Sequence, residues 1–144
     1  MKTILLCIDF SDYTTAVINK GVELAQAFDS ELCLIHVTRP IIGVGDVDTT
    51  TESVRLNVAE HFKEEHEKLQ ALSADLRDKG VNARAVLIEG APIASVVKKE
   101  AEKIDADLII IGTKGHGRIA GLCLGSVSQK LLESVSTPVL VVQN

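Results

Sequence analysis

Five short apolar segments alternate with longer amphipathic segments along the chain. The apolar segments are rich in Val, Ile and Leu and show no regular change between apolar and polar residues, so each predicts a strand buried on both faces. They cover residues 3–9, 31–37, 82–90, 106–113 and 137–143.

The segments between these strands predict helices. Apolar residues recur at helical spacing after Ser11 or Asp12, which are candidate N-caps, and again over residues 52–79. Further helices are predicted from Pro92 onward and from Gly125 to about Ser134. Gly80 stands where a left-handed C-cap glycine belongs, and residues 38–51 have no sustained period and predict a long loop.

The alternation of strand and helix predicts an α/β fold with a parallel sheet covered by helices on both faces. In such sheets a ligand binds beyond the carboxyl ends of the strands, where the strand order reverses. Polar or glycine-rich residues follow the first strand, in "IDFSD", and the fourth, in "IGTKGHGR". If these strands are neighbours, their loops face one crevice, although the alternation does not give the strand order.

Composition narrows the class of protein. The 144 residues suit a single domain, 1–144, and a net charge of −5 argues against a nucleic-acid-binding protein. The apolar run near the N-terminus is too short for a signal peptide or a membrane span. The three cysteines have no paired spacing, which fits a reducing compartment. We therefore expect a cytoplasmic protein without a membrane or nucleic-acid partner.

Five glycines lie between residues 112 and 125. Gly112 ends the fourth strand, so a bound group could approach its backbone closely. Gly125 and Ser126 open a helix, whose unpaired N–H groups and positive dipole end attract anions. The hydroxyls of Ser126 and Ser128 and three nearby side chains could add donors or positive charge: Lys114, His116 and Arg118. This combination suits a diphosphate or triphosphate, but glycines that only turn the chain and a serine that only caps the helix explain it equally well.

Other familiar motifs match poorly. The chain has no Gly-x-x-x-x-Gly-Lys-Ser/Thr sequence, and no glycine follows the first strand as a dinucleotide fingerprint requires. The segment "TKGH" (113–116) is similar to an adenylyltransferase signature, but it follows the fourth strand instead of the first. The histidines and cysteines lack metal-ligand spacing, and no set of nucleophile, base and orienting residue is recognisable.

Four segments together resemble the universal stress protein family: "IDFSDYTTAVINKGVELA", "ELCLIHV", "GTKGHGRIAGLCLGS" and "TPVLVV". The resemblance covers nearly the whole chain, in order. In this family a Gly-x₂-Gly-x₉-Gly-Ser/Thr pattern marks the ATP-binding branch, and Gly112, Gly115, Gly125 and Ser126 match it completely.

The resemblance implies a three-layer α/β/α, Rossmann-like fold whose five parallel strands lie in the order 3-2-1-4-5. The first and fourth strands would then be neighbours. It also implies a homodimer in which the strands at 138–143 of two chains pair antiparallel.

The resemblance further implies the roles of individual residues. Asp9 would contact the ribose or a phosphate-bound Mg²⁺ or Mn²⁺, and the backbone of Val37 would contact the adenine edge. The phosphate cradle would consist of Gly112, Gly115, Gly125, Ser126, Val127 and Ser128. Phe10 departs from the family, in which a glycine often precedes the serine, and its side chain is expected to narrow the site.

These observations favour an ATP-binding stress-response protein whose bound nucleotide sets a regulatory state, with hydrolysis slow, absent or dependent on a partner. A protein-interaction module without a nucleotide and an adenylyltransferase are the alternatives. His36 is expected to be a packed strand histidine, whereas the "KEEHEK" run, with His61 and His66, is expected to be a solvated helix face. For His116, a phosphate contact and exposure to solvent are equally compatible with the sequence.

Overall fold

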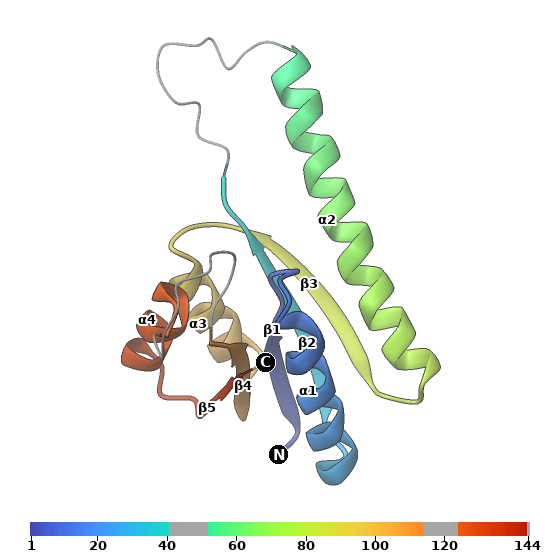
Figure 1. The fold of residues 1–144 in the computed structure, drawn as a ribbon, viewed down its shortest axis with the longest axis vertical. Helices are drawn as coiled ribbons and strands as arrows, with labels where there is room; N and C mark the ends of the chain where they lie inside the picture. Colours follow the sequence, from blue (N-terminus) through green and yellow to red (C-terminus); the bar gives the residue numbers. More distant parts are fainter. Residues whose placement is uncertain (41–51, 114–123, 144) are drawn as a thin grey trace.

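The computed structural model describes residues 1–40, 52–113 and 124–143, and in these ranges it has the predicted alternation of strands and helices (Figure 1). The strands are β1 (Thr3–Cys7), β2 (Glu31–Thr38), β3 (Ala83–Glu89), β4 (Leu108–Gly112) and β5 (Val139–Val142). The helices are α1 (Thr14–Phe28), α2 (Glu52–Asp78), α3 (Ile93–Lys103) and α4 (Ser126–Ser134). The predicted fold class is therefore confirmed.

The strands form one parallel sheet in the order β3-β2-β1-β4-β5, as expected. Leu5 in the middle of β1 is in register with Cys33 of β2 on one side and Ile109 of β4 on the other. The chain builds the sheet outward from β1 in one direction as far as β3, and then returns to place β4 on the other side of β1. The strand order thus reverses between β1 and β4, which is where α/β sheets of this kind bind ligands.

Successive side chains of the central strands enter two separate cores. Ile4 and Leu6 of β1 pack with Val17 of α1 and Leu69 of α2 on one face of the sheet. Leu5 packs with residues of α3 and α4 on the opposite face. Because strand side chains alternate between the two faces, a strand covered on both sides must be apolar throughout, which explains the unbroken apolar runs in the sequence.

Some element ends differ from the predicted ones. The strand β1 ends at Cys7, and α1 begins at Thr14 with Tyr13, not Ser11 or Asp12, at its N-cap. The intervening residues form a turn, in which the N–H of Thr14 donates to the carbonyl of Ser11 at 3.1 Å. Gly80 has φ of +80°, as a left-handed residue after a helix should.

The helix α2 extends past the carboxyl edge of the sheet at its N-terminal end (Figure 1). Its C-terminal half packs through Leu69 and Leu76, whereas Phe62 in its N-terminal half is 37% exposed. Phe28 at the end of α1 is 53% exposed. Within the described ranges, no helix combines the length and the apolar character needed to cross a bilayer.

Candidate functional site

A cavity of about 950 Å³ lies at the carboxyl edge of the sheet. This volume is typical of a small-molecule site. The cavity is lined by all of the predicted site residues that the structure describes: Asp9, Val37, Gly112, Gly125, Ser126, Val127 and Ser128. Gly115 and His116 lie outside the described residues. Residues up to 119 positions apart in the chain thus meet at one place, because β1, β2 and β4 end side by side and α4 begins beside them.

The N-terminus of α4 forms one side of the cavity. Gly125 is its N-cap, and the carbonyl of Gly125 accepts a hydrogen bond from the N–H of Gln129 at 3.0 Å. The N–H of Gly125 donates to the carbonyl of Thr113 at 2.6 Å, so this N–H group is already engaged. The first turn of the helix contains no acidic residue that would offset its positive dipole end. The groups suited to an anion are therefore the N–H groups that follow, together with the hydroxyl of Ser126.

Gly112 has a structural reason to lack a side chain. A Cβ atom placed on Gly112 would lie 2.8 Å from Cβ and 3.2 Å from Cγ of Tyr13 at the start of α1. The carbonyl of Gly112 accepts a hydrogen bond of 2.8 Å from the hydroxyl of Ser128, which is buried. The hydroxyl of Ser128 thus holds α4 against the end of β4, so a contact from Ser128 to a ligand would come from its backbone N–H.

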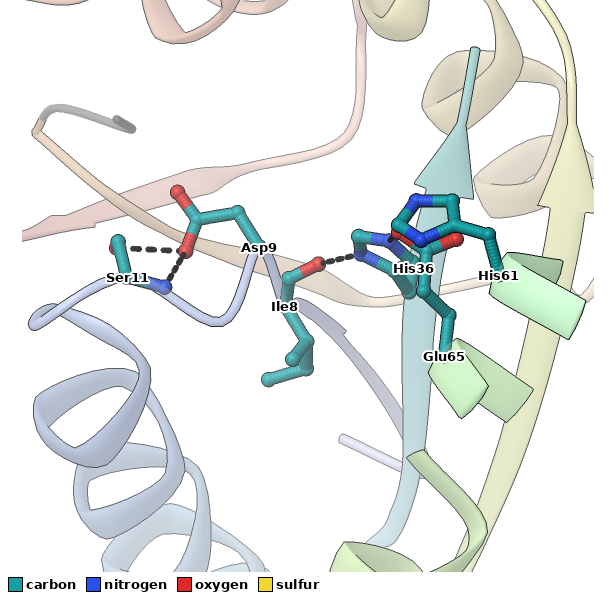
Figure 2. Close-up of polar contacts among 6 residues, drawn as sticks. All are labelled: Ile8, Asp9, Ser11, His36, His61 and Glu65. Carbon is teal, nitrogen blue, oxygen red and sulfur yellow. Dashed lines mark hydrogen bonds and ion pairs between the residues drawn. The ribbon is translucent and has the colours of Figure 1, made fainter. Parts of the chain in front are cut away.

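The carboxylate of Asp9 shapes the loop that follows β1. Its Oδ1 accepts hydrogen bonds from the N–H of Ser11 at 3.0 Å and from the hydroxyl of Ser11 at 2.6 Å, which Figure 2 shows. A longer contact of 3.4 Å joins Oδ1 to the hydroxyl of Thr14. One carboxylate oxygen thus orders the turn into α1, as Asp side chains commonly do. Among the residues described, no group of three His, Cys, Asp or Glu side chains could hold a metal ion.

Phe10 adopts an uncommon backbone conformation. Its φ is +58°, in the left-handed region where a bulky residue is strained and glycine is not. Its ring lies against the imidazole of His36, with the ring centroids 4.7 Å apart and the planes inclined by 50°. Phe10 also lines the cavity, while its expected narrowing of the site stays a prediction.

His36 is buried, as expected of a packed strand histidine, and it connects three elements (Figure 2). Its Nδ1 lies 2.7 Å from the carbonyl oxygen of Ile8. Its Nε2 lies 3.2 Å from Oε1 of Glu65 on α2, and Nε2 of His61 lies 3.2 Å from the same oxygen. The prediction that the acidic run of α2 is wholly solvated was therefore wrong for Glu65, whose side chain is only 15% exposed.

The sequence contains a signal for the burial of Glu65 that the acidic run conceals. Glu65 precedes the buried Leu69 by four residues, so it lies on the helix stripe that continues to Leu76. His61 lies one turn before Glu65, and its side chain is 58% exposed, as expected. The helical period therefore places Glu65 on the packed side, although residue type alone favours solvent.

Cys7 also lines the cavity, but its environment makes it a poor nucleophile. Burial raises the pKa of the Cys7 thiol to about 12, and the negative charge of Asp9 adds to the effect. Burial likewise raises the pKa of Cys33 to about 11. Because the thiolate is the reactive form, both thiols stay protonated and unreactive at neutral pH.

Comparison with known proteins assigns the chain to a family. The sequence pattern of the Universal stress protein family matches residues 1–143. The chain belongs to the universal stress protein family. A relative in Methanocaldococcus jannaschii, universal stress protein MJ0531, is 31% identical over 99% of this chain and 82% of its own length.

Solved structures of this family share the fold. The M. jannaschii protein MJ0577 superposes with a TM-score of 0.82 at 25% identity, covering 99% of this chain and 96% of that protein. A universal stress protein solved in complex with cAMP gives a TM-score of 0.63 at 22% identity, covering 99% of this chain and 96% of its own. The Archaeoglobus fulgidus protein solved in complex with dAMP gives 0.66 at 18% identity, covering 98% of this chain and 97% of its own.

The contact between Gly112 and Tyr13 in this universal stress protein can be tested with Gly112→Ala, alone and combined with Tyr13→Gly. We expect Gly112→Ala to lower the free energy of unfolding by about 1–3 kcal/mol, because the new methyl group overpacks the β4–α1 contact. Tyr13→Gly in the same chain removes the opposing Cβ, and glycine is an acceptable N-cap. The double variant should therefore recover most of the lost free energy of unfolding, as measured by urea denaturation. Additive effects of the two substitutions would contradict the assigned contact.

The strain at Phe10 predicts that replacing it with glycine is less destabilising than replacing it with alanine, which reverses the usual order. Both Phe10→Ala and Phe10→Gly lose the ring contact with His36, but only glycine adopts the positive φ without cost. We expect Phe10→Gly to be more stable than Phe10→Ala by about 1 kcal/mol, measured by urea denaturation. An alanine variant that equals or exceeds the glycine variant would show that the backbone at this position is unstrained.

Proposed function

We propose that this protein binds an adenine nucleotide, with ATP as the favoured ligand, in the cavity at the carboxyl edge of the sheet. The observation that carries the proposal is the meeting of the α4 N-terminus, the end of β4 and the loop after β1 around one cavity. The glycine spacing that marks the ATP-binding branch of the family is complete in the sequence. The cAMP and dAMP complexes of two proteins with the same fold support a ligand of the adenylate class.

The cavity has a suitable group for each part of such a ligand. The N–H groups of Ser126 and Val127 would bind phosphate oxygens at the positive end of α4. The backbone of Val37, at the end of β2, would contact the adenine edge. Asp9 would bind the ribose hydroxyls, or a Mg²⁺ or Mn²⁺ ion that the phosphates also coordinate, because a carboxylate without an intervening cation repels phosphate.

The bound nucleotide would act as a regulatory signal in a stress response. Among the described cavity residues, Cys7 carries the only thiol, and its raised pKa keeps it protonated. We assign no catalytic residue, and any hydrolysis of ATP would be slow or would require a partner. The free thiols of Cys7 and Cys33 suit a reducing compartment such as the cytoplasm.

A negative charge at the start of α4 tests the phosphate site. Ser126→Asp places a carboxylate where the phosphates would bind, while an acid in the first turn is favourable for the helix itself. We expect ATP and AMP to bind about tenfold or more weakly to this variant in titration calorimetry, with the fold intact.

Ser95→Asp is the matched control. Ser95 is exposed in the first turn of α3 and does not line the cavity, so the same charge change should leave affinity nearly unaltered. A wild-type protein that binds no adenine nucleotide would overturn the proposal and favour the interaction module. Pyrophosphate release from ATP in the presence of an acceptor would instead favour the adenylyltransferase.

We also propose a homodimer formed through the outer edge of β5. Within the described residues, β5 pairs only with β4, and its four residues are all partly exposed valine or leucine. An uncharged edge of this kind favours pairing with another strand. The opposite edge of the sheet, β3, differs because it contains Arg84, which forms an ion pair with Glu31 at 3.3 Å.

A proline in β5 tests the dimer. The carbonyls of Pro138 and Val142 accept hydrogen bonds from β4, so the backbone of Val141 faces the open edge. We expect Val141→Pro to give monomers in sedimentation velocity at micromolar concentration, because proline removes an edge N–H but is tolerated in edge strands. Val141→Ala, the control, should remain dimeric. A monomeric wild-type protein would refute the dimer.

A further inference from the structure

A largely buried network of polar groups joins the end of β1, β2 and α2 beside the cavity. It runs from the carbonyl of Ile8 through the imidazole of His36 to the carboxylate of Glu65, as Figure 2 shows. The side chain of His36 is 10% exposed and that of Glu65 is 15% exposed. Buried polar groups in proteins are nearly always hydrogen-bonded. Whether each nitrogen or oxygen of this network donates or accepts can therefore be inferred from the group that it faces.

The contact with Ile8 fixes one proton of His36. A carbonyl oxygen can only accept, so Nδ1 of His36 must donate to it across the 2.7 Å separation. In the neutral imidazole the other nitrogen, Nε2, then carries a lone pair. This lone pair would lie 3.2 Å from Oε1 of the Glu65 carboxylate, which is also an acceptor. Neutral His36 and ionised Glu65 therefore repel each other in this arrangement.

His61 does not share this restriction. Its exposed ring can carry its proton on Nε2 when it is neutral, and can donate to Oε1 of Glu65 across 3.2 Å. By contrast, Nε2 of His36 lies near Oε1 of Glu65 without forming a hydrogen bond to it, and Oε2 of Glu65 also has no hydrogen-bond partner among the described residues. Both atoms are shielded from solvent. A proton between Nε2 of His36 and the carboxylate of Glu65 needs no additional room.

We propose that His36 and Glu65 form a proton-operated latch. One proton between Nε2 and the carboxylate converts two facing acceptors into a charge-assisted pair that holds α2 against the sheet. When this proton leaves, the carboxylate of Glu65 turns away from His36 and the α2 wall of the cavity loosens. The latch also holds the carbonyl of Ile8, so it couples α2 to the loop that contains Asp9 and Phe10.

The charges around the latch leave Glu65 as its decisive partner. On β3, the residue in register with His36 is the uncharged Leu87. The titratable or charged groups that share the cavity lining with the pair come from the β1 end, the β2 end and α2: Cys7, Asp9, Arg39, His61, Glu64 and Lys68. The two acids and two bases among them offset one another, and the Cys7 thiol is neutral. This latch depends on no particular ligand, so the proposed nucleotide site can be wrong while the latch is right, and the reverse.

The test measures amide exchange in α2 across the range in which histidine titrates, about pH 5 to about pH 8. We expect exchange protection around Glu65, corrected for intrinsic rates, to fall about tenfold as the pH rises through this range. Glu65→Gln should abolish the change, because its amide N–H can donate to Nε2 of neutral His36 and its amide oxygen can accept from Nε2 of protonated His36. Histidine ¹⁵N spectra should show neutral His36 with its proton on Nδ1.

Glu64→Gln is the matched control, since it makes the same chemical change at the adjacent, exposed position and leaves the pair intact. This variant should retain the pH dependence of the wild-type protein. Protection that is constant with pH in the wild type would overturn the latch. The same conclusion would follow from equal behaviour of the two variants, or from a neutral His36 protonated on Nε2.

Discussion

The parallel pairing of β1 with β4 is the constraint on which the rest of this structure depends. It places β4 on the far side of β1 from β2, so the strand order reverses there. The helices that follow the two strands, α1 and α4, accordingly pack on opposite faces of the sheet. The cavity lies at this reversal, where α/β sheets commonly leave space between neighbouring strand ends.

Around this edge, many polar groups form hydrogen bonds within the protein. The hydroxyl of Ser128 and the N–H of Gly125 hold α4 and the end of β4 together, and Oδ1 of Asp9 orders the turn into α1. These contacts fix where the first turn of α4 begins. The N–H groups of that turn are thereby held in place before any ligand arrives, which lowers the entropic cost of binding an anion.

On the α2 side of the cavity, a strained backbone and side-chain contacts form the wall. Phe10 is held at a positive φ, and its ring packs against His36, which in turn faces Glu65. Strained backbone and partly satisfied buried polar groups both lower stability, and proteins tend to retain such features near functional sites. The two walls of the cavity thus differ: one presents rigid backbone donors, and the other presents side chains whose contacts depend on protonation.

The sequence by itself determined which segments form strands and helices and that both faces of the sheet are apolar. It also determined the glycine spacing beside a helix N-terminus. These properties depend on residues close together in the chain. The family resemblance added the strand order. Only the tertiary structure decided that Gly112 makes room for Tyr13, that the ring of Phe10 packs against His36, and that Glu65 is mostly shielded from solvent beside His36. Each of these contacts joins residues from separate parts of the chain, and their approach depends on sheet register and helix placement, which local periodicity does not contain.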